Sequence, residues 1–277
     1  MKRLALFTVI LAGVLFAATA SEFPRLGDPD SAPSRHLSPA YIQGSLPQTH
    51  TPNFVTAVLG DYRGFDTMFE TAVVFLAGMS CFFILRALRR RGLTEVYYYR
   101  HKPTGVVLAM LAPRRISPRT SCFERIDADW TPQDMVVETM CLFMVPFIQV
   151  FALYVIAHGH YSPGGGFQGG VLLAASFILV GLSRDLRTVE SLLTEKTAIL
   201  TAAAGVCLYA GTGLLALFFG GNFLDYGAYA SFFGAAVPAA RSMGILIVEI
   251  GVALTVMATL VTIYKLVSSR GTVEEGL

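Results

Sequence analysis

Charged residues are scarce in this 277-residue chain, where Asp, Glu, Lys and Arg together make up 14% of the sequence. An ordinary soluble domain carries about 25%, whereas hydrophobic residues here reach 54%. The low charge and high apolar content exclude intrinsic disorder. The apolar residues also come in long blocks instead of amphipathic stripes, which argues against a water-soluble globule. The composition therefore predicts an all-α polytopic membrane protein.

Cysteine is also rare, and no two cysteines form a Cys-x-x-Cys pair. Three of the four lie inside apolar blocks, where cysteine behaves as a small hydrophobic residue. The sequence lacks iron–sulfur ligand spacings, a P-loop, and a Gly-x-Gly-x-x-Gly that follows a strand. We therefore expect no metal site, no cofactor and no disulfide framework. The four cysteines are Cys81, Cys122, Cys141 and Cys207.

Six apolar blocks approach or exceed the roughly 20 residues that a membrane-spanning helix needs. They cover residues 4–20, 66–86, 135–157, 168–183, 197–220 and 242–266. The first block follows Lys2 and Arg3 and ends at Ala18-Thr19-Ala20, which is also the pattern of a cleavable signal peptide. The alternative is that the segment is retained as a signal-anchor helix. The prediction of six membrane-spanning helices assumes that it is retained.

The basic residues favour one orientation of these six helices. If the N-terminus is cytoplasmic, 17 of the 21 Lys and Arg residues fall on the cytoplasmic side, as the positive-inside rule requires. Both termini of this multi-pass protein are thus predicted to be cytoplasmic. Basic residues beside spans are expected in any such protein, so no nucleic-acid partner is inferred from them.

Two segments outside the blocks differ in composition. Residues 21–64 form an outer segment rich in Pro and Ser, with no strong helical or strand pattern before Phe54. Residues 87–134 form a basic inner loop that includes Arg89-Arg90-Arg91 and Arg114-Arg115. Its apolar stretch from Gly105 to Ala112 is too short to span, and we expect it to lie at the interface beside anionic lipid.

Acidic residues inside or near the blocks are candidates for an ion path. A carboxylate at the bilayer centre costs roughly 2.5–3.5 kcal/mol, so such residues usually face protein or water. Asp66 and Glu70 are four residues apart and share a helix face. Alternatively, Asp66 caps its helix, with Arg63 three residues before it as a partner.

Two further acids lie in later blocks. Glu138 falls early in its helix, so a role at the helix start competes with a role in ion transfer. Glu249 has apolar neighbours on both sides and no role at a helix end, which makes it the strongest single candidate. The alternative for Glu249 is a protonated side chain that hydrogen-bonds to a neighbouring subunit.

The connection after the third block contains two histidines and a run of glycines. His158 and His160 flank the outer end of that block and can accept protons near an outer opening; a turn at the membrane surface explains them more simply than a metal site. Five glycines follow within seven positions, which helix propensity does not explain. They indicate tight helix packing, a non-helical element near an ion path, or both.

This connection resembles a signature of a known family. Residues 159–170 match Gly-His-x-x-Pro-Gly-Gly-Gly-Phe-x-Gly-Gly of the B subunit of Mrp-type multisubunit cation/proton antiporters. The family's last helix carries Phe-Asp-Ile-Gly-Val, and Val248-Glu249-Ile250-Gly251-Val252 is similar but has a longer acid. The resemblance covers residues 130–277, a four-helix domain. The matching residues of the turn are Gly159, His160, Pro163, Gly164, Gly165, Gly166, Phe167, Gly169 and Gly170.

A second resemblance lies upstream, in the segment Asp61-Tyr-Arg63-Gly64-Phe-Asp66-Thr-Met-Phe-Glu70. It is similar to Asp-Phe-Arg-Gly-Phe-Asp-Thr-x-x-Glu near the end of the large A subunit of Mrp antiporters, which related membrane-bound hydrogenases carry as a separate small subunit. The chain is therefore predicted to fuse an A-subunit-tail-like part (residues 1–86) to the B-like domain through a basic cytoplasmic linker (residues 87–129).

These resemblances imply a subunit of a multisubunit Na⁺(or K⁺)/H⁺ antiporter in the cell inner (cytoplasmic) membrane of a bacterium or archaeon, one that is not an enzyme by itself. The implied partners are large antiporter-like subunits, small membrane subunits and membrane lipid, with Na⁺ or K⁺ and H⁺ as the transported ions. One alternative is a membrane-arm subunit of a redox-driven ion-pumping complex, such as a hydrogenase or a relative of respiratory complex I. Another is a purely structural scaffold subunit.

Overall fold

The structure, a computed structural model, describes residues 2–89, 96–111, 116, 122–125 and 135–269. The chain divides into two compact units, and the boundary lies between Gly44 and Ser45. The first unit contains an apolar N-terminal helix. The second contains the long helices that carry the glycine-rich turn and the acids discussed above, together with a small sheet.

The first unit holds α1 (Lys2–Ala20), the single π-helical turn η1 (Pro33–Leu37) and the beginning of α2 (Ser38–Thr49). α1 is apolar from Leu4 to Ala20, which confirms a helix in the first apolar block. In the Pro- and Ser-rich segment 21–64, where the sequence has no strong helical pattern before Phe54, the structure forms η1 and α2. The prolines of α2 lie near the two helix ends, and the first turn of a helix needs no N–H donor from proline.

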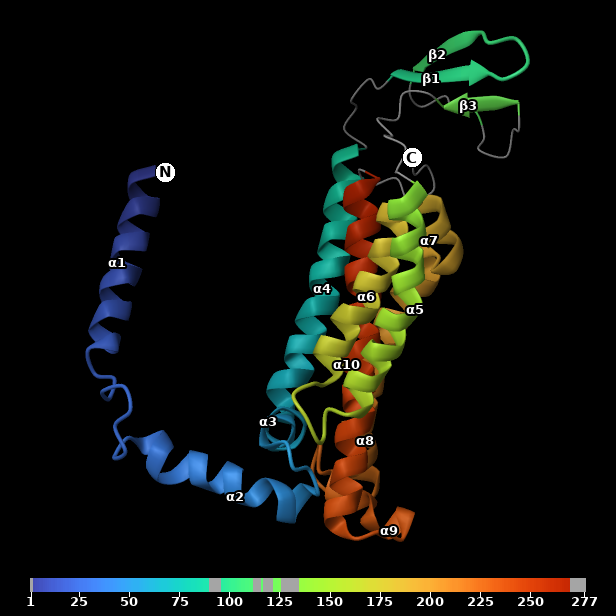
Figure 1. The fold of residues 1–277 in the computed structure, drawn as a ribbon. Coiled ribbons are helices and arrows are strands. Elements are labelled where there is room, and N and C mark those ends of the chain that lie inside the picture. Colours follow the sequence, from blue (N-terminus) through green and yellow to red (C-terminus); the bar gives the residue numbers. More distant parts are fainter. Residues whose placement is uncertain (1, 90–95, 112–115, 117–121, 126–134, 270–277) are drawn as a thin grey trace. The chain divides into compact units, whose positions relative to one another are not determined.

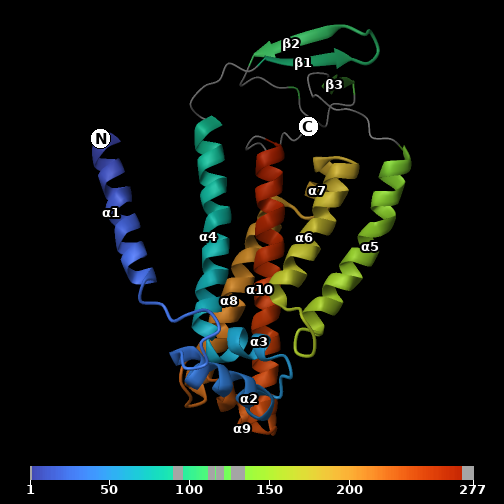
Figure 2. The same cartoon turned by 60° about the vertical axis from the view of Figure 1, so that its left-hand side comes forward.

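Five helices of the second unit are long and apolar enough to cross a membrane, which confirms an all-α polytopic membrane protein. Each coincides with one of the remaining five predicted blocks. They are α4 (Gly64–Arg89), α5 (Met135–Ala157), α6 (Gly166–Ser183), α8 (Glu195–Phe218) and α10 (Val237–Ser268). α10 runs through the middle of this bundle (Figures 1 and 2) and is the most buried of the five.

Small residues let the neighbouring helices approach α10 closely. A Cβ atom on Gly251 of α10 would lie 2.8 Å from the carbonyl oxygen of Gly205 in α8. A Cβ on Gly170 of α6 would lie 2.8 Å from the carbonyl oxygen of Ala253, and one on Gly78 of α4 would lie 2.6 Å from Thr259. Such close approach at small residues is typical of helices packed in a membrane.

Short elements connect the long helices. α3 (Phe54–Ala57) and the π-helical turn η2 (Val58–Tyr62) precede α4, and α7 (Leu186–Leu192) lies between α6 and α8. The 3₁₀ turn η3 (Tyr226–Tyr229) and α9 (Ala230–Phe233) connect α8 to α10. Side chains cap the starts of α7 and α8: the Asp185 carboxylate accepts from Thr188 N–H, and the Thr194 hydroxyl accepts from Thr197 N–H.

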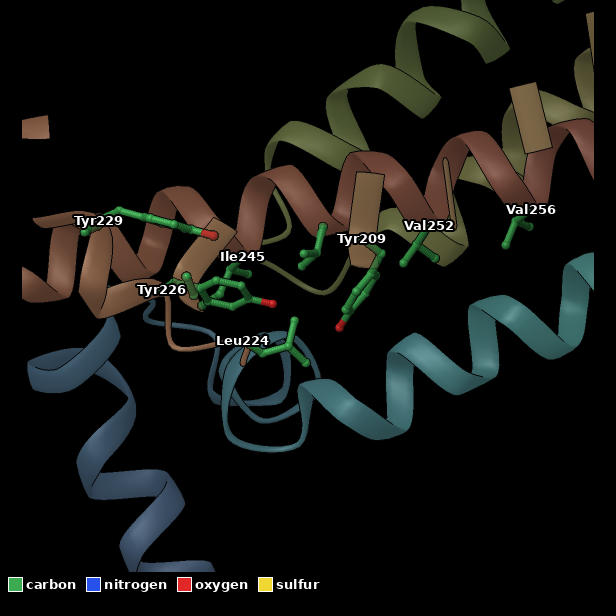
Figure 3. Packing of buried hydrophobic residues seen from close by; sticks show 10 residues of the cluster. Tyr209, Leu224, Tyr226, Tyr229, Ile245, Val252 and Val256 are labelled. Atoms are coloured by element: carbon green, nitrogen blue, oxygen red, sulfur yellow. The ribbon is translucent and has the colours of Figure 1, made fainter. Parts of the chain in front are cut away.

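A buried hydrophobic cluster fills the space between α8, η3 and the first half of α10 (Figure 3). Three tyrosines belong to it, and their rings are almost completely inaccessible. The Tyr209 hydroxyl donates to the carbonyl oxygen of Gly64 at 2.9 Å, which attaches the start of α4 to this cluster. Burial raises the pKa of the Tyr226 phenol, so this ring stays neutral.

The basic loop contains a three-stranded antiparallel sheet with the order β2-β1-β3, built from β1 (Val96–His101), β2 (Val107–Leu111) and β3 (Phe123–Arg125). The apolar stretch after Gly105 is therefore strand β2, in register with β1 from Leu111 opposite Val96 to Val107 opposite Arg100. Its contact with lipid stays a prediction. The arginines at positions 90, 91, 114 and 115 lie outside the described residues.

Candidate functional site

The glycine-rich connection between α5 and α6 wraps against the middle of α10 (Figures 1 and 2). α5 ends at Ala157 and α6 begins at Gly166, so the intervening residues are not part of a regular helix. Gly165 has φ of +143°, a conformation that favours glycine. A Cβ on Gly166 would collide with the carbonyl group of Glu249, since it would lie 2.8 Å from the carbonyl carbon and closer still to the oxygen.

The Glu249 carboxylate lies across two glycines of this turn. A Cβ on Gly159 would lie 3.1 Å from Glu249 Oε2, and a Cβ on Gly165 would lie 3.1 Å from Glu249 Oε1. Both carboxylate oxygens thus contact turn residues that have no side chain. Any larger residue at these two positions would displace the carboxylate, so the glycines create the space that Glu249 occupies.

One oxygen of this carboxylate has no partner. Glu249 Oε2 is buried and accepts no hydrogen bond from the part of the chain that the structure describes. A buried polar atom without a hydrogen bond costs about 1–3 kcal/mol, so such an atom is usually satisfied by something else. A proton, a cation, a water molecule or a group from another subunit can satisfy it.

The Gln168 side chain lies on the same side of the turn. A Cβ added to Gly165 would lie 3.4 Å from Gln168 Oε1 as well as 3.1 Å from Glu249 Oε1. Sequence reasoning did not single out Gln168, although it stands within the glycine motif between Phe167 and Gly169. An amide oxygen beside a carboxylate is a common pair of cation ligands.

The two histidines of the connection have different surroundings. His160 is buried, and its Nε2 atom lies 3.0 Å from the carbonyl oxygen of Ser242 in α10. The His158 ring stacks on Tyr154, with 4.6 Å between ring centroids. Within the described residues, no group of three or more His, Cys, Asp or Glu side chains is placed to hold a metal ion.

The other predicted acids have separate surroundings. Arg63 Nε donates to Asp66 Oδ2 at 2.6 Å in the first turn of α4, which confirms the pairing that the spacing suggested. Glu138 accepts from Arg184 Nε at 3.2 Å, and both side chains are substantially exposed. Glu70 lies on the exposed surface of α4. Of these predicted acids, the structure therefore brings only Glu249 to the glycine turn.

Two buried ion pairs were missed by sequence reasoning. The Arg241 guanidinium binds the Asp61 carboxylate with both branches, with 2.8 Å between Nε and Oδ2, and the Asp61 side chain is only 7% exposed. The Lys265 ammonium is fully buried and donates to Glu190 Oε2 and to the Leu193 carbonyl oxygen, each at 2.6 Å. A signal for Arg241 existed, because it is one of only four basic residues on the predicted outer side.

The Lys265 pair belongs to a longer network at its end of the bundle. The backbone N–H of Glu195 donates to Glu190 Oε1 at 2.8 Å. The Glu195 carboxylate in turn accepts two hydrogen bonds from Arg86 Nη2, at 2.6 and 2.7 Å. Helices α4, α7, α8 and α10 are thus linked by charged groups.

Two family models match this chain. A domain related to the MnhB subunit of Na⁺/H⁺ antiporters matches residues 136–262, and the MbhE family, described as the E component of MBH, matches residues 3–95. The first match contains the glycine turn and Glu249, and the second contains the Asp61–Glu70 motif. Together they confirm the two resemblances found in the sequence.

Similar proteins include antiporter components from several bacteria. The chain is 38% identical over 93 residues to the B subunit of a Na⁺/H⁺ antiporter of Bacillus subtilis (34% of this chain, 64% of that one). It is 34% identical over 131 residues to putative antiporter subunit mnhB2 of Staphylococcus haemolyticus (47% and 91%). It is 28% identical over 210 residues to a probable A/B subunit of a K⁺/H⁺ antiporter of Rhizobium meliloti (73% and 19%).

The chain spans 64% of the length of the Bacillus relative and 19% of the Rhizobium relative. Solved structures that share its fold include two membrane complexes. One is the archaeal membrane-bound sulfane sulfur reductase, with a TM-score of 0.58, 22% identity and 95% coverage of both chains. The other is the Mrp complex of Dietzia sp. DQ12-45-1b, with a TM-score of 0.55, 23% identity and coverage of 95% of this chain and 26% of that one.

Proposed function

Because this chain belongs to the MnhB family of Na⁺/H⁺ antiporter subunits, we propose that it is a membrane subunit of a multisubunit Na⁺(or K⁺)/H⁺ antiporter. It assists assembly and lines part of the cation and proton path. In this proposal the chain catalyses no reaction alone, and it combines an A-subunit-tail-like part (residues 1–86) with a B-subunit-like domain (residues 130–277). The match to a relative named as a combined A/B protein supports this combination.

The observation that carries the proposal is the unpartnered Glu249 carboxylate in a membrane-spanning helix. Glu249 Oε2 is buried without a protein hydrogen bond among the described residues, and two glycines of a non-helical turn lie against it. Ionisable groups at this depth are costly and typically mark ion or proton pathways. Non-helical backbone in a membrane is tolerated where it lines a cavity or is buried in protein. Glu249 would bind a proton in one step of the cycle and release it in another, with a cation bound to the carboxylate in place of the proton between these steps.

The test replaces Glu249 in the assembled complex. Glu249→Gln keeps the size of the side chain but removes its proton exchange, and we expect at least a tenfold lower rate of cation/proton exchange in everted membrane vesicles. Glu138→Gln is the matched control, because its acid is also in a spanning helix but is paired with Arg184 and half-exposed. Blue-native gels measure assembly. Normal exchange by an assembled Glu249→Gln complex would refute the role in the ion path and leave a scaffold role.

The partners in this proposal are other antiporter subunits, both large and small, and membrane lipid. Glu70 supports a protein partner on α4, since its carboxylate is on the exposed surface of a spanning helix and an unpaired acid rarely faces lipid. Phe69 and Val73 next to it are also exposed, at 61% and 62%. A transmembrane helix with a basic or hydrogen-bonding side chain would cover this face.

The proposed location is the cytoplasmic membrane with both chain ends inside the cell. The distribution of Lys and Arg supports it, since 17 of 21 fall on one side of the spans. In this orientation the Lys265–Glu190 network is at the cytoplasmic end of the bundle and the glycine turn is toward the outer side. Accessibility of single introduced cysteines to a membrane-impermeant thiol reagent measures the sidedness directly.

A second candidate is a membrane-arm subunit of a redox-driven ion pump. The observation in its favour is the fold shared with a chain of the sulfane sulfur reductase over 95% of both chains, together with the MbhE match. Affinity purification from native membranes, followed by mass spectrometry, separates the two candidates. Large antiporter-like subunits without redox proteins would support the antiporter, whereas nickel–iron or iron–sulfur subunits would support the pump.

A further inference from the structure

We infer that Asn53 and Thr56, which lie before the first long helix of the second unit, are positioning residues that hold the glycine turn against Glu249. This inference rests on the proposed role of Glu249 as an ion-path residue. We call the hydrogen bonds from Asn53 and Thr56 to the glycine turn the clamp, because they connect the A-tail-like part to the B-like domain. None of the motifs that carry the two resemblances includes either residue.

The Asn53 side chain reaches a turn more than a hundred residues later in the chain. Its Nδ2 atom donates to the carbonyl oxygens of Gly159 and Ser162, each at 2.9 Å. Its backbone N–H donates to the carbonyl oxygen of His160, also at 2.9 Å. Three carbonyl groups of the non-helical connection are therefore satisfied by one residue of the other part.

Thr56 adds a second donor to the same position. Its hydroxyl is buried and donates to the Gly159 carbonyl oxygen at 2.8 Å. The Asn53 Nδ2 atom also lies 3.0 Å from the Thr56 hydroxyl oxygen, so one of its two N–H groups is shared between that oxygen and a carbonyl group of the turn, and the two side chains orient each other. The Gly159 carbonyl group thus accepts from both side chains, and its orientation is fixed from two directions.

Gly159 is the residue through which the clamp reaches the carboxylate. A Cβ on Gly159 would lie 3.1 Å from Glu249 Oε2 and 3.1 Å from the Gly165 Cα. Rotation of the Gly159 peptide would therefore change the walls around both carboxylate oxygens. Without the two donors, its carbonyl group would need water or a new partner, and the turn would open beside Glu249.

Asn53 also caps α3, because its Oδ1 atom accepts from Val55 N–H at 3.2 Å. A purely local role in α3 is the competing explanation, and one substitution separates the two. Asn53→Asp keeps an acceptor for the cap, since Asp is as good a cap as Asn, but removes both donors to the turn. At the second position, Thr56→Val removes the hydroxyl at nearly constant volume and Thr56→Ser retains it.

The experiment measures how readily the Glu249 carboxyl group reacts with the apolar reagent N,N′-dicyclohexylcarbodiimide in membranes that contain the assembled complex. Peptide mass spectrometry reports the labelled fraction of Glu249 over time, and Glu249→Gln supplies the unlabelled control. We expect Thr56→Val, which loses one hydrogen bond to the turn, to label about fivefold faster, and Asn53→Asp, which loses two, to label faster still. Thr56→Ser should restore the native rate.

Exchange in the same vesicles is measured separately. Under the inference, Asn53→Asp and Thr56→Val lower the exchange rate while Thr56→Ser does not. Native labelling rates in both donor-removing variants would overturn the clamp. If these variants label faster but Glu249→Gln exchanges normally, the clamp stands and the ion-path role of Glu249 fails. If Asn53→Asp does not assemble, the Thr56→Val and Thr56→Ser pair decides alone, because each changes a single buried side chain.

Discussion

Asp61 and Arg241 are 180 residues apart in the chain, yet they form a two-branched ion pair between the segment before α4 and the start of α10. Asp61 belongs to the motif that resembles the A-subunit tail, and Arg241 belongs to the MnhB-like match. Together with the Asn53 clamp, the pair attaches one part to the other near the glycine turn. The two parts of this chain are therefore joined by charge and hydrogen bonds as well as by apolar packing.

Removal of one partner from this pair should be costly. Arg241→Gln leaves the Asp61 carboxylate, 7% exposed, without its counter-charge, and breaking a buried pair costs about 3–5 kcal/mol. The apparent melting temperature of the purified protein should fall by about 6 °C or more. The control is Arg63→Gln, because its pair with Asp66 is about 60% exposed and exposed pairs contribute little. Equal losses in both variants would contradict the prediction.

Hydropathy predicted the long helices because each spanning segment needs about 20 apolar residues, which the chain supplies in separate blocks. It did not predict α2, where proline and serine obscured the helix, or strands β1 and β2 in the basic loop. The glycine turn and Glu249 were each singled out as separate features. Their direct contact was not, because spacing along the chain does not report which turn packs against which helix.

The charged residues show the same limit. The Arg63–Asp66 pair was predictable, since residues three apart meet on one helical turn. The partners in the Asp61–Arg241 and Lys265–Glu190 pairs are 180 and 75 residues apart, and nothing local in the sequence selects them. Asn53 was missed for the same reason, since its amide contacts carbonyl groups more than a hundred residues away.

Glu70 should matter for exchange through a partner protein. Its carboxylate is on the exposed surface of α4, so in the assembled complex it needs a neighbour that compensates its charge. We expect Glu70→Gln to lower the exchange rate and leave complex assembly intact. A photo-reactive residue at Val73, one turn away and 62% exposed, should cross-link to another subunit. Cross-links to lipid alone would contradict a protein partner on this face.

The Gly165 position should not accept even one added methyl group. Gly165→Ala places a Cβ 3.1 Å from Glu249 Oε1 at a φ of +143°, where a side chain is strained. We expect lower exchange and a reduced yield of the complex on blue-native gels, and a larger loss with Gly165→Val. Gly211→Ala in α8 is the matched control, because its Cβ would meet no atom within 4 Å and alanine favours a helix by about 1 kcal/mol. Similar losses from both substitutions would show that general helix packing, and not the turn, is responsible.

The pair at the other end of α10 should respond asymmetrically to the loss of each partner. Lys265 is fully buried, whereas the Glu190 side chain is 28% exposed. Glu190→Gln removes the carboxylate from a buried ammonium, and an uncompensated buried charge costs about 3–5 kcal/mol. Lys265→Met instead leaves Glu190 with access to water and with its hydrogen bond from Glu195 N–H, and methionine fills the space of the lysine chain. The apparent melting temperature should therefore fall further for Glu190→Gln than for Lys265→Met. The opposite order would mean that the Leu193 carbonyl group, which also accepts from Lys265, is sufficient to hold the ammonium.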